Sequence, residues 1–357
     1  MADDRDRAAD APRELARAGL RPSSPDEPGY TRRRHGRGFR YFAPDGRAVT
    51  DHETKARLKD LVIPPAWTEV WICVEPDGHV QAVGTDDAGR RQYLYHPRWR
   101  ALRDRAKHDR VLDFAERLPE VRERVAAGLD QGGLGPERVL AGSIRLVDLG
   151  FFRSGGESYA DENDTYGVAT LLREHVSCTR GRVVFDYPAK GGRRREVELA
   201  DDRLCALVTA LKRRRAPGPE LLAYRVPGGW HDVRSEDVNG YLRELAGPKA
   251  SVKDFRTWHA TVLAAVGVAV STDVPRDSAG RQRAEARVVS EVAEYLGNTP
   301  AVARASYIDP RVFELYRRGV TIRSKLPKLA ADASFGELST GGPVEDAVRT
   351  MLRRARD

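Results

Sequence analysis

The period of the hydrophobic pattern changes near residue 105, and this change constrains the fold of the 357-residue chain more than any other feature. Residues 29–105 carry short apolar runs separated by Pro, Asp and Gly, which is typical of strands joined by tight turns. Over residues 106–330, apolar residues recur at helical spacing. We therefore expect an α+β protein with a small β-rich N-terminal domain and a larger, mostly α-helical domain.

Two hairpins and one helix are predicted within residues 29–105. Each hairpin turns at a Pro-Asp-Gly sequence, and the strand pairs are Gly38–Phe42 with Ala48–Thr50 and Val70–Glu75 with Val80–Thr85. The helix between them is Asp51–Leu61. Within Tyr30–Lys59, nine Lys or Arg stand against three Asp or Glu. Such a local excess of positive charge favours a nucleic acid as the partner.

Helices dominate the prediction for residues 106–330. Their expected ranges are Asp109–Ala127, Pro136–Asp148, Thr165–Cys178, Ala200–Arg214, Ser235–Leu245, Thr257–Val268 and Glu285–Leu296. A single hairpin, Val183–Pro188 with Arg194–Leu199, interrupts them. Residues 1–28 are predicted to be a disordered tail, and residues 331–357 a linker with a short helix, Val344–Arg354.

Composition narrows the class of protein. The formal net charge is +8 and the sequence pI is near 9.5, which fits a polyanionic partner but does not require one. Only nine of the 61 basic residues are lysines. A lysine can release a proton, whereas an arginine effectively cannot, so an isolated lysine among arginines is a candidate acid.

Several classes are disfavoured by what the sequence does not contain. Cys73, Cys178 and Cys205 lie far apart, so neither a disulfide framework nor a zinc site is predicted. No His-Glu-x-x-His, P-loop or Gly-x-Gly-x-x-Gly motif occurs. The N-terminus is charged, and the longest apolar run, Val262–Val270, is too short for a membrane span. We expect a soluble, cytoplasmic protein with no membrane association.

Tyr307 is the candidate nucleophile. It lies shortly before Pro310, which ends the local helix, and a basic helix, Val312–Arg318, follows. A free phenol has a pKa of about 10, so it attacks poorly unless cations favour the phenolate. By itself, a tyrosine is more commonly a packing residue. The assignment therefore depends on cations elsewhere in the sequence.

Two arginines and a lysine are candidates for those cations. Arg153 precedes Gly155 and Gly156, which allow close approach of a backbone to a ligand. Arg256 lies among aromatic residues where a helix is expected to open, near its positive end. Lys190 lies at the tip of the predicted hairpin and is the one lysine beside five arginines in residues 180–195, which favours a general acid. The alternatives are buried arginine–carboxylate pairs and a solvated turn lysine.

Taken together and in order, these segments resemble the catalytic domain of poxvirus-like bacterial type IB DNA topoisomerases. The resemblance runs from about Gly38 to Pro327. The N-terminal segments are Arg37–Tyr41, Ile63–Trp67 and Gly89–His96. The catalytic segments are Phe152–Gly155, Tyr166–Val168, Lys190-Gly191, Lys253–Trp258, Leu296–Pro300 and Ser306–Pro310.

The resemblance implies a chemical role for six residues. Tyr307 attacks a backbone phosphodiester, forms a 3′-phosphotyrosyl bond and releases a 5′-OH. Arg153, Arg256 and Asn298 stabilise the transition state, Lys190 protonates the leaving oxygen, and Lys253 is a further active-site lysine. No metal ion, ATP or other cofactor is implied. Viral members place a histidine where this chain has Asn298, so a slower cleavage step is conceivable here.

The resemblance also implies a mode of DNA binding. A monomer of the family closes around double-stranded DNA as a C-shaped clamp. Arg90, Gln92, Tyr93 and Tyr95 are expected to approach the major groove, and Tyr159 a phosphate. The expected location is therefore the cytoplasm, in association with the nucleoid. The alternative for these five residues is ordinary surface polarity.

Two other functions are compatible with parts of the sequence. A tyrosine recombinase shares the catalytic core, but it carries a histidine at the position of Lys253 and a helical N-terminal domain. A catalytically silent DNA-binding protein is the second alternative. Every expected catalytic position holds a competent side chain, which argues against the silent protein.

Overall fold

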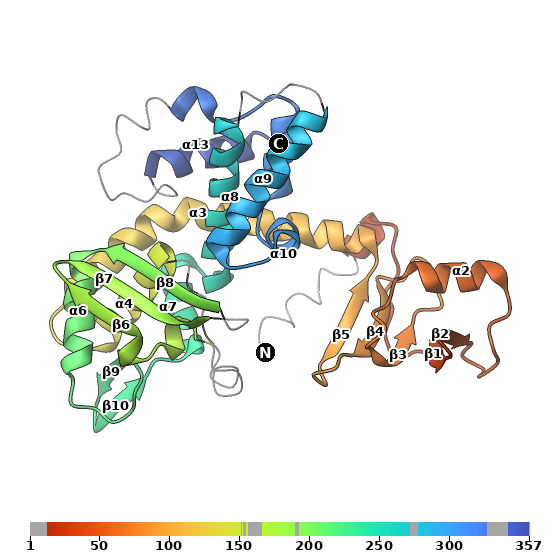
Figure 1. Ribbon diagram of the computed structural model, residues 1–357, viewed down its shortest axis with the longest axis horizontal. Coiled ribbons are helices and arrows are strands. Elements are labelled where there is room, and N and C mark those ends of the chain that lie inside the picture. The colour runs from red at the N-terminus through yellow and green to blue at the C-terminus, as the bar shows by residue number, and fades with distance from the viewer. Residues whose placement is uncertain are drawn as a thin grey trace. The chain divides into compact units, whose positions relative to one another are not determined.

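The computed structural model describes residues 13–150, 152, 155, 166–189, 193–271, 278–326 and 342–356. The chain divides into two compact units, Met1–Lys107 and His108–Asp357, and each is described by itself (Figure 1). The first is built on a β-sheet and the second mainly on helices, which confirms the α+β class. Within the described ranges, no helix is both long and apolar enough to cross a membrane.

A five-stranded antiparallel sheet forms the first unit, in the order β2-β1-β3-β4-β5. The strands are β1 (Tyr30–His35), β2 (Gly38–Phe42), β3 (Thr68–Ile72), β4 (Val80–Thr85) and β5 (Arg91–Tyr95). Helix α2 (His52–Asp60) begins where Asp51 accepts a hydrogen bond from the Thr54 amide at 2.6 Å. Its Leu58 packs with Tyr41 and Ile72 in the core of this unit.

The first predicted hairpin is confirmed at its turn, where the Val49 amide donates to the Tyr41 carbonyl at 3.0 Å, but its main strand pairing is different. β2 pairs with β1, and Gly36 makes the turn with φ +57°, a conformation that glycine adopts readily. Ala48 forms only an isolated bridge with Phe42. β1 was missed because its Thr-Arg-Arg-Arg-His run has few apolar residues to mark a buried face. The second predicted hairpin is confirmed as β3 and β4, whereas β5 was not predicted.

The N-terminal segment that the structure describes is ordered, so the prediction of a disordered tail is wrong for residues 13–28. Leu15 and Leu20 are buried against Trp99. The Trp71 indole donates a hydrogen bond to the Glu27 carbonyl at 2.8 Å. This packing uses only a few apolar residues, such as Leu15 and Leu20, and most of the segment is charged or polar. Its composition therefore gave no sign of an ordered segment. Residues 1–12 lie outside the described residues.

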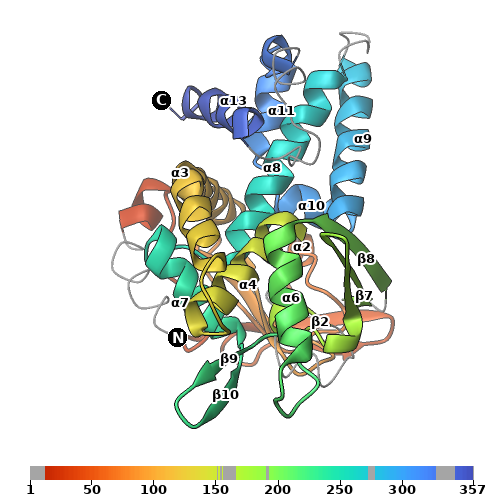
Figure 2. The same cartoon turned by 90° about the vertical axis from the view of Figure 1, so that its left-hand side faces the viewer.

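Helix α8 lies among the other helices of the second unit, with α9 and α13 on different sides of it (Figure 2). Most of its residues are buried, including Phe255, Trp258 and Val262. The helices are α3 (Pro97–Leu129, which begins in the first unit), α4 (Pro136–Gly150), α6 (Asp202–Arg213), α7 (Ser235–Ala246), α8 (Val252–Val270), α9 (Ser278–Leu296), α10 (Pro300–Ser306), α11 (Pro310–Arg317) and α13 (Gly342–Arg353). Six of the seven predicted helices are confirmed, with shifted ends.

The predicted helix Thr165–Cys178 is wrong. Short 3-10 turns at Val168–Thr170 and Arg173–His175 lead into β6 (Val176–Thr179). Val176 is β-branched, pairs with Phe185 of the neighbouring strand and is buried there. Such contacts with distant residues outweigh the helical spacing of the local sequence.

The second unit therefore contains more strands than the single predicted hairpin. That hairpin is confirmed as β7 (Arg182–Ala189) and β8 (Arg193–Ala200), and β6 adds a third strand to it. A further hairpin, β9 (Ala223–Val226) with β10 (Gly229–Asp232), was not predicted. Its turn contains Gly228 at φ +88°, and the Pro-Gly-Gly sequence there was the available signal.

Cys178 of β6 and Cys205 of α6 form a disulfide, with their Cα atoms 5.6 Å apart. The prediction that the cysteines would not pair is therefore wrong for these two, and Cys73 is a buried free thiol. The pair is separated by 27 residues along the chain. Packing of α6 on β6 brings them together, and cysteine spacing alone carries no sign of that packing.

Candidate active site

The first turns of α8 carry Lys253 and Arg256. The Ser251 amide and hydroxyl donate to the Asp254 carboxylate at 2.8 and 2.9 Å, so a side chain three residues into the helix secures its start. The helix begins at Val252 and not near Thr257 as predicted. Arg256 consequently lies inside the helix and is only 2% exposed, whereas Lys253 is exposed.

Tyr307 lies directly after α10, and its ring faces both of these cations. The Arg256 Cζ is 5.4 Å from the ring centroid and the Lys253 Nζ is 6.0 Å from it. Cations at such distances over a ring are attracted by its π electrons. The structure thus brings together three predicted site residues from segments about fifty positions apart in the sequence.

Asn298 is placed by the way α9 ends. Gly297 has φ +61°, its amide donates to Glu294, and the Asn298 amide donates to Ala293 at 2.8 Å. These are the two hydrogen bonds of a Schellman motif, which requires a left-handed residue such as glycine. The Arg256 Nη2 donates to the Leu296 carbonyl at 2.7 Å. Arg256 and Asn298 are therefore both located by the end of α9.

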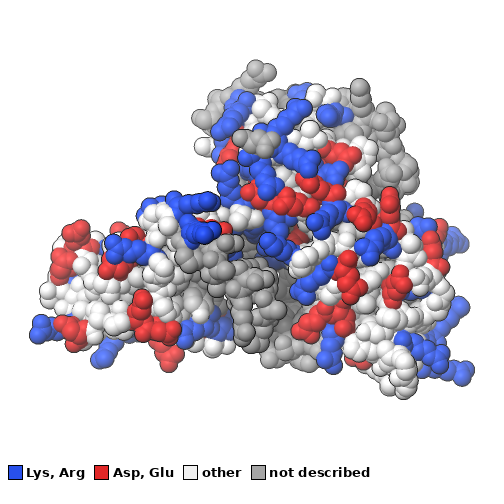
Figure 3. All heavy atoms as spheres, turned by 180° about the vertical axis from the view of Figure 1, so that it is seen from behind, with Lys and Arg blue, Asp and Glu red and all other residues white. Residues whose placement is uncertain are grey.

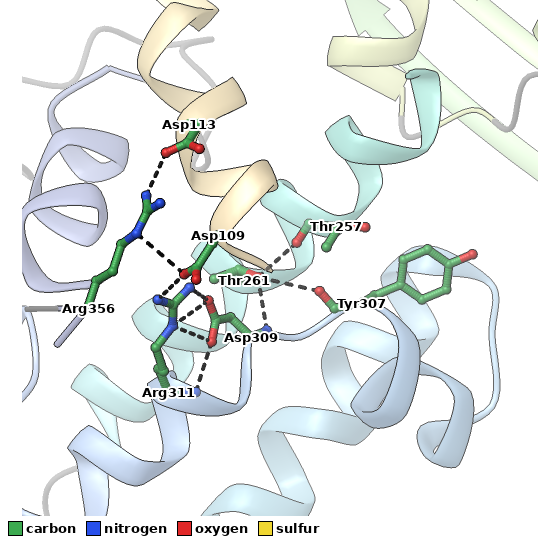
Figure 4. A network of polar contacts seen from close by, with 8 residues as sticks. All are labelled: Asp109, Asp113, Thr257, Thr261, Tyr307, Asp309, Arg311 and Arg356. Atoms are coloured by element: carbon green, nitrogen blue, oxygen red, sulfur yellow. Dashed lines mark hydrogen bonds and ion pairs between the residues drawn. The ribbon is translucent and has the colours of Figure 1, made fainter. Parts of the chain in front are cut away.

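The chain just after Tyr307 is anchored to Thr261, which lies five residues beyond Arg256 on α8. The Thr261 Oγ1 lies 3.4 Å from the Tyr307 carbonyl and accepts a hydrogen bond from the Asp309 amide at 3.1 Å (Figure 4). The side chain of Tyr307 points away from these contacts. The main chain after Tyr307 is thus anchored on α8, while the ring of Tyr307 faces Lys253 and Arg256.

Asp309 and Arg311 continue this network. The buried Asp309 accepts hydrogen bonds from the Arg311 amide and guanidinium, with Nη2 at 2.6 Å, and Asp109 of α3 contacts Arg311 Nη1 at 2.7 Å (Figure 4). Burial opposes the charge of Arg311, but the hydrogen bonds and charge of Asp309 raise its pKa above the ordinary value. The sequence did not single out these residues, although an Asp before Pro is a helix-start signal.

A network of mostly buried polar side chains connects α8 with α3, α4 and α13. We call its five residues the α8 node: Arg122, Asp148, Glu345, Trp258 and His259. Arg122 of α3 donates to Asp148 of α4 at 2.8 and 3.0 Å and to Glu345 of α13 at 2.5 and 3.1 Å. Burial would raise the pKa of the Asp148 carboxyl, but Arg122 holds it well below its usual range. The node joins four helices through paired charges.

Three predicted site residues, Arg153, Lys190 and Tyr159, lie outside the described residues. Their neighbours show how the adjoining chain is anchored. Phe152 is buried and stacks on Tyr187 of β7 with ring centroids 5.7 Å apart. Gly155 has φ +79°, and a Cβ there would lie 2.9 Å from the Thr170 hydroxyl, so a side chain is excluded.

Four residues on or just before β5 were predicted to bind DNA, and they do not lie on one face of the sheet: Arg90, Gln92, Tyr93 and Tyr95. The rings of Tyr93 and Tyr95 stack with centroids 6.1 Å apart and are 46% and 43% exposed. Gln92 pairs with Gly84, on the face where Leu94 meets the core. Arg90 and Gln92 both donate to Asp86, and hydrogen bonds from Arg90 lower the Asp86 pKa to about 2.

Much of the positive charge on the second unit is already paired. Figure 3 shows acidic side chains among the basic ones over its helices. Examples are Arg353 with Glu116 and Arg356 with Asp113, each at 2.6 Å. Net charge is therefore a poor guide to the DNA-binding surface. Among the residues that the structure describes, no group of three or more His, Cys, Asp or Glu is arranged to hold a metal ion.

Two family models and several known proteins are similar to this chain. A family model described as the catalytic core of eukaryotic DNA topoisomerase I matches residues 96–326, and one for the N-terminal domain of bacterial DNA topoisomerase IB matches residues 38–86. DNA topoisomerase 1B of Acanthamoeba polyphaga mimivirus is 27% identical over 296 residues, which is 81% of this chain and 88% of the relative. The vaccinia virus (strain Copenhagen) enzyme is 23% identical over 242 residues, 66% of this chain and 72% of the relative.

Both family models and both of these relatives are DNA topoisomerases. Because the catalytic-core model covers more than half of the chain, the protein belongs to the type IB DNA topoisomerase family. Its substrate is DNA.

Proposed function

We propose that the protein relaxes supercoiled duplex DNA by transient cleavage of one strand, with Tyr307 as the nucleophile. The phenol loses its proton to water, its oxygen forms a bond to the phosphorus, and the bond from phosphorus to the 5′-oxygen breaks. A proton moves to that 5′-oxygen, and Lys190 is assigned as its donor by family resemblance. The reverse attack of the 5′-OH reseals the strand. The energy of the phosphodiester is retained in the phosphotyrosyl bond, so ATP has no role.

The observation that carries this proposal is the position of Arg256 and Lys253 over the Tyr307 ring. In-line attack adds negative charge to the non-bridging oxygens of the phosphate. Cations that are held in place before the substrate arrives stabilise that charge without reorganisation. Arg153 and Asn298 are assigned to the same task by family resemblance, with Asn298 donating a neutral hydrogen bond. Positive side chains then do what a metal ion does in other phosphoryl-transfer enzymes.

Relaxation of plasmid DNA is the direct test of this function. The purified monomer is expected to relax both negatively and positively supercoiled plasmid in the presence of EDTA and without ATP. Gel electrophoresis would show ladders of topoisomers converging on the relaxed form. A strict need for ATP or for a divalent cation would contradict the proposed chemistry. Recombination products at specific sites, with no relaxation, would support a tyrosine recombinase instead.

We also propose that Tyr93 and Tyr95 contact DNA from the first unit. A pair of stacked, exposed aromatic rings on a solvated sheet face is unfavourable in water and fits a partner surface. Arg90 and Gln92, which Asp86 orients, would contact the same duplex from the adjoining edge. Tyr159 is retained as a phosphate contact on family resemblance alone.

The double variant Tyr93→Ala/Tyr95→Ala is expected to bind duplex DNA about tenfold more weakly, which corresponds to roughly 1.4 kcal/mol. Fluorescence anisotropy at several salt concentrations would measure the affinity, and the cleavage rate at saturating DNA should be unchanged. Val62→Ala, which shortens another exposed apolar side chain of this unit, is the control. An unchanged affinity in the double variant would remove these tyrosines from the DNA-binding surface.

A further inference from the structure

Helix α13 lies beyond the residues that match the catalytic-core model, which end at residue 326. It packs on α8 through Ala347, Val348, Met351 and Leu352, all of which are buried. Glu345 is the one charged residue on this buried face, and it is 4% exposed. A carboxylate in an apolar interface costs free energy unless it is paired, so its partners indicate what it is for.

Those partners belong to α3 and α8. The Glu345 Oε1 accepts a hydrogen bond from the Trp258 indole at 2.8 Å, and both carboxylate oxygens accept from Arg122. Arg122 in turn holds the Asp148 carboxylate, which accepts a hydrogen bond from the His259 Nε2 at 3.1 Å. Glu345 is therefore the residue that α13 contributes to the α8 node.

The node acts on the same helix as the transition-state cation. Trp258 follows Arg256 by two residues, so the two side chains leave α8 about 200° apart. Arg256 faces Tyr307 and the end of α9, while Trp258 faces α13. Asp148, at the end of α4, is five residues before Arg153. The node thus joins the helix that carries Arg256 to the helix that leads to Arg153.

We propose that Glu345 is a positioning residue for strand cleavage, which fixes the rotation and height of α8 so that Arg256 stands over the Tyr307 ring. This inference rests on the proposed function. Shifts of about 1 Å in a catalytic group lower rates by roughly 100-fold, so loss of this brace affects chemistry before it affects DNA binding. The C-terminal helix is accordingly part of the catalytic unit.

The other end of α13 is held more weakly. Arg356 lies 2.6 Å from Asp113 and 3.9 Å from Asp109, and its side chain is 41% exposed. Asp109 also contacts Arg311, which leads to Asp309 and the backbone of Tyr307 (Figure 4). Exposed ion pairs contribute little, because water competes with them. The effect of α13 on catalysis therefore depends chiefly on Glu345.

The test measures single-turnover cleavage of a duplex whose short 5′-OH product strand dissociates, so that the covalent complex accumulates. Glu345→Gln removes the charge, and Trp258→Phe removes only the indole donor. Both variants are expected to cleave roughly 10- to 100-fold more slowly at saturating DNA, with dissociation constants within about twofold of wild type. Arg353→Ala, which breaks an exposed ion pair on the same helix, is the matched control and should cleave at the wild-type rate.

A double-mutant cycle separates positioning from general destabilisation. If Glu345 acts through Arg256, then Glu345→Gln should add almost nothing to the loss caused by Arg256→Ala. Additive losses would overturn the inference, as would wild-type cleavage rates in folded Glu345→Gln and Trp258→Phe. Thermal unfolding confirms that each variant is folded at the assay temperature. Failure of the wild type to form a covalent complex would instead overturn the proposed function itself.

Discussion

Tyr307→Phe is expected to abolish DNA relaxation, with a loss of at least about 10⁴-fold in the cleavage rate. The substitution removes the attacking oxygen and nothing else. The ring keeps its place beside Arg256 and Lys253, and the backbone contact with Thr261 does not involve the side chain. Folding and non-covalent DNA binding should therefore remain as in the wild type. Plasmid relaxation measures the loss.

Denaturing electrophoresis of DNA labelled upstream of the cleavage site identifies the nucleophile itself. The wild type should carry labelled DNA into the protein band, and Tyr307→Phe should not. Tyr316→Phe is a matched control, because it removes a hydroxyl from another tyrosine of the same unit, which lies 3.5 Å from the Ser271 carbonyl. A covalent complex formed by Tyr307→Phe would move the nucleophile to another residue.

Arg256→Ala is expected to slow both cleavage and resealing by about 10² to 10³-fold, the usual cost of one preorganised donor to a transition-state oxyanion. The affinity for intact DNA should change much less, because the charge that Arg256 stabilises develops only during the reaction. Arg256→Lys should recover little of the loss. A lysine keeps the charge but has no planar fork that can bond to the Leu296 carbonyl and a phosphate together.

The measurement is a pair of single-turnover rates, one for cleavage and one for resealing of the isolated covalent complex. Arg243→Ala on α7 is the control, since it removes an exposed arginine from the same unit. Equal losses in the two directions would show that Arg256 serves their common transition state. A loss confined to DNA affinity would assign Arg256 to substrate binding only.

The sequence predicted elements whose determinants are local. Asp51 at the start of α2 is a signal that the neighbouring residues alone can satisfy. Pro300 and Pro310 are local signals of the same kind, but the prediction used Pro310 only as the end of the preceding helix and placed no helix at α10. Strand pairing has no such local determinant. The sequence of β1 is mostly polar, and it forms a strand because β2 and β3 pair with it. Val176 lies in a strand because it pairs with Phe185. The disulfide between Cys178 and Cys205 depends on the same long-range packing.

The candidate site shows a similar division. Tyr307, Arg256, Lys253 and Asn298 were proposed from ordered motifs, and the first three meet in the structure. Their supports were not predicted. Thr261 reads as one more position in an apolar helix, and Glu345 as one charge in an amphipathic one. What these two residues do depends on which atoms face them from distant segments, and periodicity carries no information about that.

The hydrogen bond from Arg256 to the Leu296 carbonyl fixes this side chain when the protein folds, before DNA binds. A free arginine side chain has about 2 kcal/mol of rotamer entropy to lose. Here burial and the carbonyl remove that freedom when the chain folds, long before DNA arrives. One edge of the guanidinium is bonded to the protein, so in the proposed reaction the remaining edge meets the phosphate with its orientation already fixed. The encounter with DNA therefore begins with an arginine that has no disorder left to lose.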